Sequence, residues 1–205
     1  MSNGGYDSGY KKCPCYWGQD PANLVLKAAD ILNDSRDLKA MDFGCGEGKN
    51  SFALASRGFS VVAIDCSEYA LKNATSKHSS KNIMYLQASI NDIKGPSDTY
   101  DLALATGSLH CLENEDQIIK AIRTMQTVTK VGGINVVTGF DLGPHDLSGH
   151  PTDFHPTLLP YTFYLGQYEG WNIIESSSTV QEDIHPDNEI SHHHSITRLL
   201  AIKTA

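Results

Sequence analysis

The sequence lacks the features that would direct it to a membrane or to nucleic acid. No apolar run approaches the roughly 20 residues that cross a bilayer, and residues 1–10 are polar and glycine-rich, without the apolar core of a signal peptide. Only 16 Lys and Arg stand against 24 Asp and Glu, the net charge is −8, and no stretch forms a basic patch. DNA, RNA and ribosomes are therefore unexpected substrates, because they bind basic surfaces. We expect a cytoplasmic protein with no membrane partner and no nucleic-acid partner.

Cysteine is also sparse. The five cysteines are dispersed and odd in number, which indicates reduced thiols rather than a disulfide framework. Cys13 and Cys15 stand two positions apart and make half a metal site at best. The 205 residues are enough for one α/β domain with a sizeable core, so we expect a single domain over residues 1–205.

The most informative segment that is present is a glycine-rich turn between two apolar strands. Residues 41–48 read Met-Asp-Phe-Gly-Cys-Gly-Glu-Gly, and residues 61–65 end in Asp65. Alternate glycines let the backbone turn sharply and leave room for a ligand. Asp65 stands about 20 residues beyond the first glycine, where a nucleoside-binding α/β fold places a carboxylate for ribose. A dinucleotide fingerprint would need its third glycine at Lys49, which disfavours a nicotinamide oxidoreductase. An ordinary strand–helix turn without a ligand is the alternative.

Hydrophobic periodicity predicts alternating strands and helices. We expect strands at residues 38–43, 61–64, 83–86, 100–106 and 134–138, and helices at residues 22–32, 50–56, 68–78 and 117–129. Asp20 and Pro21 match the N-cap and first position of the first of these helices. Strands that alternate with helices in this way predict a doubly wound parallel sheet.

The two ends of the chain follow other patterns. Residues 1–20 are expected to be a mobile N-terminal segment. Residues 141–160 are rich in Gly, Pro and His without periodicity, which is typical of a substrate lid. A short helix is expected at residues 158–168. Residues 171–180 and 195–203 match two strands joined by a polar connection, which predicts an antiparallel hairpin.

The glycine turn resembles the D-x-G-x-G-x-G motif of class I S-adenosylmethionine-dependent methyltransferases. Residues 87–90 and 131–133 extend the resemblance along the chain. Residues 42–51 and 168–171 are similar to the tellurite-resistance (TehB-like) branch of small-molecule methyltransferases. The resemblance implies a Rossmann-like seven-stranded sheet in the order 3-2-1-4-5-7-6 with the last strand antiparallel. It also implies S-adenosyl-L-methionine as cofactor and in-line methyl transfer to a small-molecule acceptor.

Carried over position by position, the resemblance implies a cofactor site at the carboxyl ends of the strands. Gly44, Cys45 and Gly46 would pass under the methionine moiety, and Asp42 would reach its amino group directly or through water. Asp65 would accept hydrogen bonds from both ribose hydroxyls. The adenine would be contacted by Cys66, Ser89, Ile90 and the backbone carbonyl of Thr106.

Two positions depart from the family pattern. Ser89 stands where the family usually has an aspartate, and a hydroxyl accepts hydrogen bonds more weakly than a carboxylate. The tellurite branch has arginines after its C-terminal histidine, whereas His185 is followed by a histidine run at residues 192–194 and by Arg198 alone. The missing cationic clamp for an anion disfavours tellurite as the substrate.

Histidines dominate the candidates for the acceptor site. His110, just after the fourth expected strand, and His185 are the candidate catalytic residues, because an imidazole can serve as a base if the acceptor must lose a proton. The further substrate-binding candidates are His155, His192, His194, Tyr10 and Trp17. We assign no metal ligand, but a three-histidine metal site of His185, His192 and His194 is an alternative.

Two functions from different classes remain open at this point. We expect an S-adenosylmethionine-dependent methyltransferase (EC 2.1.1.-) for a small molecule, acting as a monomer or homodimer. The alternative is a catalytically silent S-adenosylmethionine-binding module or partner subunit. The histidine-rich lid favours the enzyme. The acceptor atom, whether O, N, S, Se or Te, is not identified by the sequence.

Overall fold

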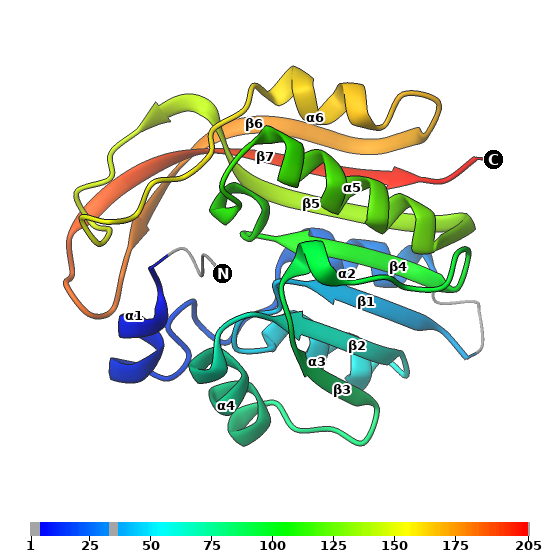
Figure 1. Ribbon diagram of the computed structural model, residues 1–205, viewed down its shortest axis with the longest axis horizontal. Helices are drawn as coiled ribbons and strands as arrows, with labels where there is room; N and C mark the ends of the chain where they lie inside the picture. The colour runs from blue at the N-terminus through cyan, green and yellow to red at the C-terminus, as the bar shows by residue number, and fades with distance from the viewer. Residues whose placement is uncertain (1–4, 33–36, 205) are drawn as a thin grey trace.

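A computed structural model describes residues 5–32 and 37–204 and shows one sheet with helices on both faces (Figure 1). Seven strands pair in the order β3-β2-β1-β4-β5-β7-β6. β1 to β5 pair in parallel, and β7 runs antiparallel to both β5 and β6. The expected sheet order and antiparallel strand are therefore confirmed. The strands are β1 Lys39–Phe43, β2 Ser60–Asp65, β3 Ile83–Gln87, β4 Tyr100–Thr106, β5 Thr129–His145, β6 Asn172–Ile184 and β7 Ser191–Ile202.

The helices begin where capping side chains or tertiary contacts allow. The Ser67 hydroxyl accepts the Ala70 N–H at the start of α4, as a capping residue should. The prediction that Asp20 and Pro21 begin the first long helix is wrong, because the Asn50 side chain holds the N–H of Ala22, which becomes the N-cap. The helices are α1 Asp7–Lys12, α2 Asn23–Ile31, α3 Lys49–Ser56, α4 Glu68–Lys77, α5 Glu115–Val128 and α6 Tyr161–Gln167, with short 3-10 turns η1 Ile90–Asp92 and η2 Leu109–Cys111.

The core lies on both faces of the central strand β4. Leu102 and Leu104 pack into one apolar cluster, whereas Ala103 and Ala105 pack into the cluster on the opposite face. All four side chains are fully buried. Because alternate residues of a strand point to opposite faces, an entirely apolar strand belongs at the centre of a covered parallel sheet. None of the helices within residues 5–32 and 37–204 has the length and apolar character needed to cross a bilayer.

The C-terminal strands are longer than the sequence predicts. β5 continues to His145 and so includes the first five residues of the expected lid, while residues 146–160 form an irregular loop. β6 and β7 extend over most of the expected polar connection, which leaves residues 185–190 as the hairpin loop. The histidine run therefore lies in β7, where His192 and His194 are buried on one face and His193 is half-buried on the other.

The described part of the N-terminal segment, residues 5–20, packs against the domain at the carboxyl edge of the sheet (Figure 1). Tyr6 and Tyr10, at the beginning of α1 and within it, are both buried. Residues 1–4 lie outside the described residues. Mobility of residues 1–20 stays a prediction, but the described residues form a cover over the end of the sheet. We call residues 5–18 the N-terminal cover.

Candidate active site

The glycine turn after β1 has three residues in the left-handed region. Gly44, Gly46 and Gly48 have φ of 78°, 52° and 82°, angles that favour glycine. A Cβ on Gly44 would lie 2.3 Å from the Cβ of Ser108, and one on Gly48 would lie 2.4 Å from the Tyr85 hydroxyl. A Cβ on Gly46 would meet only the Tyr10 hydroxyl, at 3.4 Å. Gly44 and Gly48 are therefore required by packing, whereas Gly46 leaves space beneath the N-terminal cover.

A cavity lies over this turn, at the carboxyl ends of the parallel strands. It holds about 590 Å³ of space, part of it open to solvent. Such crevices are where open α/β sheets bind their ligands. Its lining includes five of the predicted cofactor residues: Gly44, Asp65, Cys66, Ser89 and Ile90. We call it the cofactor cavity.

The Asp65 carboxylate is the main polar group in the cofactor cavity. Its two oxygens accept the backbone N–H of Gly46 at 2.7 Å and of Ser67 at 2.8 Å. No Lys or Arg within the described ranges forms an ion pair with it, and burial raises its pKa. The backbone of Cys66 also hydrogen bonds to this carboxylate, and because a carboxylate offers about four acceptor positions, capacity remains for a hydroxyl donor. The position fits the ribose that the resemblance implies.

Asp42 lies beneath the turn and is fully buried. Its Oδ2 accepts the Ser51 hydroxyl at 2.7 Å, whereas its Oδ1 has no hydrogen-bond partner among the residues that the structure describes. Burial raises the pKa of this carboxyl to about 7. Asp42 does not line the cofactor cavity, so its orphaned acceptor fits the amine of a methionine moiety reached through water, because an unmet acceptor is costly.

A larger cavity adjoins the first. The two share Gly44, Tyr6, Tyr10 and Trp17 as lining residues. The larger one also includes three predicted cofactor residues, Cys45, Gly46 and Thr106, together with His110, Phe140 and Arg198. The Thr106 hydroxyl accepts the Asn50 amide at 2.7 Å. We call this space the acceptor cavity, because it meets the cofactor cavity at the glycine turn.

The N-terminal cover is fastened to the glycine turn by Glu47, a residue that the sequence analysis missed. Its carboxylate accepts the N–H of Cys15 at 2.7 Å and of Tyr16 at 2.6 Å. The Asn73 amide donates to the same carboxylate at 2.9 Å, and Lys49 donates to the backbone carbonyl of Trp17. The only available signal was a glutamate placed between two glycines, and nothing in the sequence indicates what it contacts.

His110 lines the acceptor cavity but is poorly suited to act as a base. Its Nδ1 accepts the Phe140 N–H at 3.2 Å, and its ring stacks on the Phe140 ring with 4.1 Å between the ring centroids. Burial lowers its pKa to about 3, with the nearby His194 and His145 adding to the effect. The ring is therefore neutral with its proton on Nε2, which makes His110 a hydrogen-bond donor.

Behind Phe140, three more imidazoles form a directional chain of hydrogen bonds. The carbonyl of Asp141 accepts from His145 Nε2 at 2.6 Å, so His145 Nδ1 accepts from His194 Nδ1 at 3.2 Å. His194 Nε2 then accepts from His150 Nε2 at 2.9 Å, and His150 Nδ1 from the Tyr6 hydroxyl at 3.4 Å. Burial lowers the pKa of His150 and of His194 to about 3, which keeps these two rings neutral in this chain.

The other acceptor candidates are divided between two places. Tyr10 and Trp17 line both cavities. His185, His192 and His194 cluster together, each only 1% exposed, and Phe140 lies between His194 and His110. His155 is exposed and is not a lining residue of either cavity. The structure therefore does not bring these histidines together with His110 into one pocket.

Arg198 is a second residue whose role the sequence analysis missed. It lies in β7 as expected, but it also lines the acceptor cavity. Its guanidinium donates to the Thr179 hydroxyl at 2.7 Å and to the Gln181 amide oxygen at 2.5 Å. Within residues 5–32 and 37–204 it forms no ion pair with a carboxylate. Lys49 lines the same cavity and is likewise absent from the ion pairs of the described residues, so the acceptor cavity holds two cations without a carboxylate partner.

Comparisons with known proteins point in one direction. The sequence model of the family described as "Tellurite resistance protein TehB" matches residues 19–192. A Haemophilus influenzae protein named "Probable S-adenosyl-L-methionine-dependent methyltransferase TehB" is 28% identical over 173 residues, covering 80% of this chain and 55% of the relative. The chain thus spans about half the length of that curated relative.

Solved structures share the fold. The crystal structure of TehB from Haemophilus influenzae superimposes with a TM-score of 0.69 at 24% identity, covering 88% of this chain and 61% of the other. A Burkholderia thailandensis 1,6-didemethyltoxoflavin-N1-methyltransferase with bound S-adenosylhomocysteine superimposes with a TM-score of 0.66 at 17% identity. The match covers 98% of this chain and 86% of the other. At these identities the likeness concerns the fold alone.

Proposed function

The chain belongs to the tellurite resistance protein TehB family, and from that premise we propose that it is an S-adenosylmethionine-dependent methyltransferase for a small molecule. The observation that carries the proposal is the pair of adjoining cavities that meet at the glycine turn. One has the carboxylate and backbone expected of an adenosyl site, and the other has room for an acceptor. A transfer reaction needs such a second cavity, because the acceptor must lie beside the bound cofactor.

Residues of this chain would hold the cofactor in the following way. Asp65 would accept the ribose hydroxyls, the turn at residues 44–46 would pass beneath the methionine moiety, and Asp42 would hold its amino group. Cys66, Ser89 and Ile90 are proposed for the adenine end. Thr106, which the resemblance also assigns to the adenine, lines the acceptor cavity and not the cofactor cavity. When bound, S-adenosylmethionine supplies a methyl group already activated on a sulfonium.

The chain's own contribution to transfer would be alignment and exclusion of water. Tyr10 and Trp17 line both cavities, and the Trp17 indole donates to the Tyr10 hydroxyl at 3.2 Å. A cover at the junction of the two cavities keeps water away from the reacting atoms and fixes the acceptor in line. The part of residues 141–160 that follows β5 is proposed as a lid that packs on this cover, because His150 and Phe154 contact Tyr6; none of its residues lines either cavity.

The acceptor cavity favours an acceptor that is already nucleophilic. His110 is a neutral donor with a pKa of about 3, so it is a poor base at neutral pH. Arg198 supplies one cation without a carboxylate partner. We propose a small acceptor that is anionic or readily ionised, such as a thiolate, with its charge near Arg198.

Calorimetry and turnover test the proposal. We expect the chain to bind S-adenosylmethionine and S-adenosylhomocysteine but not NAD, and to methylate members of a panel of thiols, carboxylates, amines and hydroxyls. Binding of the sulfonium without any turnover would instead support the silent module. Binding of NAD alone would contradict both. A single domain over residues 1–205, a cytoplasmic location and a monomeric or homodimeric state stay predictions.

A further inference from the structure

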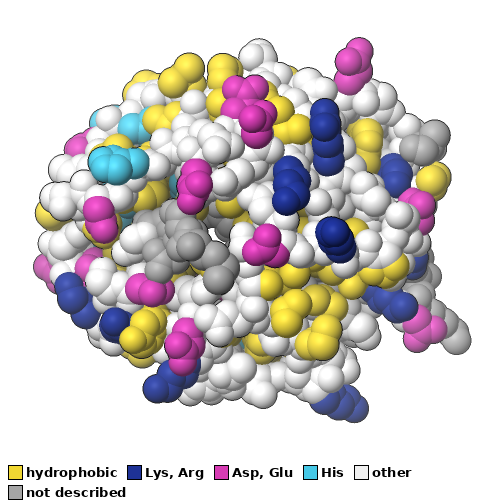
Figure 2. Space-filling view, in the orientation of Figure 1, with side chains coloured by type: hydrophobic (Ala, Val, Ile, Leu, Met, Phe, Trp, Pro, Cys, Tyr) yellow, Lys and Arg dark blue, Asp and Glu magenta, His cyan; other side chains and the backbone are white. Residues whose placement is uncertain are grey.

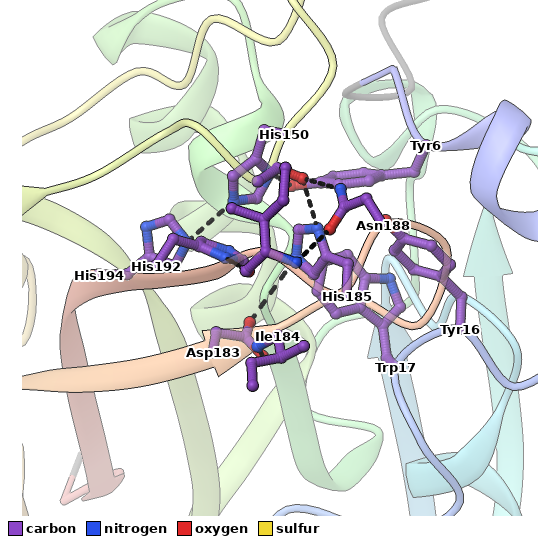
Figure 3. A network of polar contacts seen from close by, with 12 residues as sticks. Tyr6, Tyr16, Trp17, His150, Asp183, Ile184, His185, Asn188, His192 and His194 are labelled. Carbon is purple, nitrogen blue, oxygen red and sulfur yellow. Dashed lines mark hydrogen bonds and ion pairs between the residues drawn. The ribbon is translucent and has the colours of Figure 1, made fainter.

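Two buried imidazole nitrogens next to the acceptor cavity have no hydrogen-bond partner. His185 Nδ1 donates to the Gly149 carbonyl at 2.9 Å, and His192 Nδ1 donates to the Ile190 carbonyl at 2.8 Å. Each Nε2 therefore carries a free lone pair, and neither has a partner in the part of the chain that the structure describes. Both residues are 1% exposed. Figure 3 shows these rings together near the end of the β6–β7 hairpin.

Asp183 brings a third donor atom to the same place. Its Oδ1 accepts the Ile184 N–H at 2.9 Å, while its Oδ2 lies 3.8 Å from His185 Nε2, too far for a hydrogen bond. One donor atom from each of Asp183, His185 and His192 lies within 4.8 Å of those of the other two. Ligands about 2.0–2.1 Å from a zinc ion stand roughly 3.3 Å apart, so small side-chain movements would complete the site.

We propose that Asp183, His185 and His192 form a binding site for a divalent first-row transition-metal ion, with zinc as its simplest occupant. Two neutral imidazoles and one carboxylate are a donor set for such ions. Metal-bound histidines almost always donate their other ring N–H to a carbonyl or carboxylate, which fixes the tautomer. Gly149 and Ile190 supply those carbonyls here.

A second set of histidines near the same point is less suitable. His150, His192 and His194 also have donor atoms within 4.8 Å of one another. However, His150 Nε2 and His194 Nε2 are 2.9 Å apart and hydrogen bond to each other. The chain from Asp141 to Tyr6 therefore uses their lone pairs, whereas those of His185 and His192 remain available.

The proposed metal would connect the hairpin to the N-terminal cover. The His185 ring contacts Trp17 edge-on, with 5.1 Å between ring centroids, and Asp183 lines the acceptor cavity. The Tyr16 hydroxyl donates to Asp187 in the hairpin loop at 3.0 Å. A metal at this position would fix the hairpin end against residues 16–17, and its binding does not depend on the proposed methyl transfer.

Zinc titration of the full chain tests the site. The protein is prepared without a polyhistidine tag, stripped with chelator and titrated with zinc by calorimetry, and cobalt is added separately to record its ligand-field absorption. We expect one zinc per chain and a rise in melting temperature. His185→Ala, His192→Ala and Asp183→Asn should each weaken zinc binding at least about 100-fold. Even the loss of a hydrogen-bond partner of a metal ligand lowers metal affinity about 10–100-fold.

Two variants serve as matched controls. His193→Ala removes the neighbouring imidazole on the other face of β7, and His155→Ala removes an exposed one; both should bind zinc as the wild type does. Asp183→Asn keeps the size of a half-buried side chain, so it tests the site even if a histidine variant fails to fold. No stoichiometric zinc in the wild type, or equal losses in controls and ligand variants, would overturn the proposal.

Discussion

The Glu47 carboxylate accepts the backbone N–H of Tyr16 at 2.6 Å and joins the N-terminal cover to the glycine turn. The same carboxylate accepts the N–H of Cys15, so one side chain holds two consecutive amides. Glu47 belongs to the turn over which the cofactor cavity lies. Its contacts therefore couple the position of the cover to the conformation of the turn.

Replacing this carboxylate should loosen the cover. In Glu47→Gln an NH2 group, which cannot accept a hydrogen bond, replaces one carboxylate oxygen. A hydrogen bond to a charged group contributes about 1.5–3 kcal/mol to stability. We expect hydrogen exchange at the Cys15 and Tyr16 amides to accelerate about 10–100-fold, measured by exchange mass spectrometry or NMR. The exposed Glu169→Gln is the control and should leave exchange there unchanged. Equal protection in both variants would show that Glu47 does not hold the cover.

Gly44 and Gly46 should respond differently to alanine. Both have positive φ, which costs an alanine roughly 1–2 kcal/mol. Only at position 44 would the new Cβ also lie 2.3 Å from the Cβ of Ser108. Overpacking adds about 1–3 kcal/mol. We expect Gly44→Ala to lower the free energy of unfolding by about 2–4 kcal/mol in urea titrations, and Gly46→Ala by about 1–2 kcal/mol. The double variant Gly44→Ala/Ser108→Gly should recover part of the loss, and additivity would contradict the proposed contact.

The sequence predicted the parallel half of the fold because its signals are local. Apolar β4, the glycine turn and the capping Ser67 each lie within a few residues of the structure they specify. The order of the sheet and its antiparallel strand came from the resemblance to a family, not from periodicity. The helix expected from Asp20 instead begins at Asn23, since Asn50 holds Ala22 from a distant part of the chain.

The candidate site was predictable only where the glycine turn places it. Asp65 ends strand β2 and Ser89 follows strand β3, so both reach the carboxyl edge of a parallel sheet. The lengths of β5, β6 and β7 depend on pairing between strands, and no local signal in the histidine-rich segment predicts them. For the same reason the sequence could not show that His110 and His192 lie in different places. His110 stacks on Phe140, whereas His192 lies in the extended part of β7.

Asp65 should be essential for cofactor affinity. Two hydroxyl bonds to a carboxylate are worth about 1.5–3 kcal/mol each, so Asp65→Asn should weaken S-adenosylmethionine binding by roughly 10–100-fold or more in calorimetry. Because Asp65 also accepts two backbone amides, the melting temperature of the variant is measured in parallel. The exposed Asp116→Asn is the control. Unchanged affinity in a folded Asp65→Asn protein would remove Asp65 from the cofactor site.

His110 should make the protein less stable in acid. Its pKa is about 3 in the folded state, against its ordinary value of 6.5. Between these values the unfolded chain binds a proton that the folded chain does not, so the free energy of unfolding must fall as pH falls below 6.5. One pKa unit corresponds to about 1.4 kcal/mol, so lowering the pH from about 7.5 to 5 should cost roughly 2 kcal/mol through this residue.

Urea unfolding at these two pH values, in chelator, tests the sign and the residue. His110→Gln keeps an acceptor for the Phe140 N–H but removes the titrating ring, so its unfolding free energy should depend less on pH by roughly that 2 kcal/mol. His150 and His194 remain and continue to contribute their own dependence. The pH dependence of turnover between about 5.5 and 7.5 should be the same in both proteins, because a residue with a pKa of about 3 does not titrate there. An equal loss of stability in acid in the two proteins would show that folding does not lower the pKa of His110.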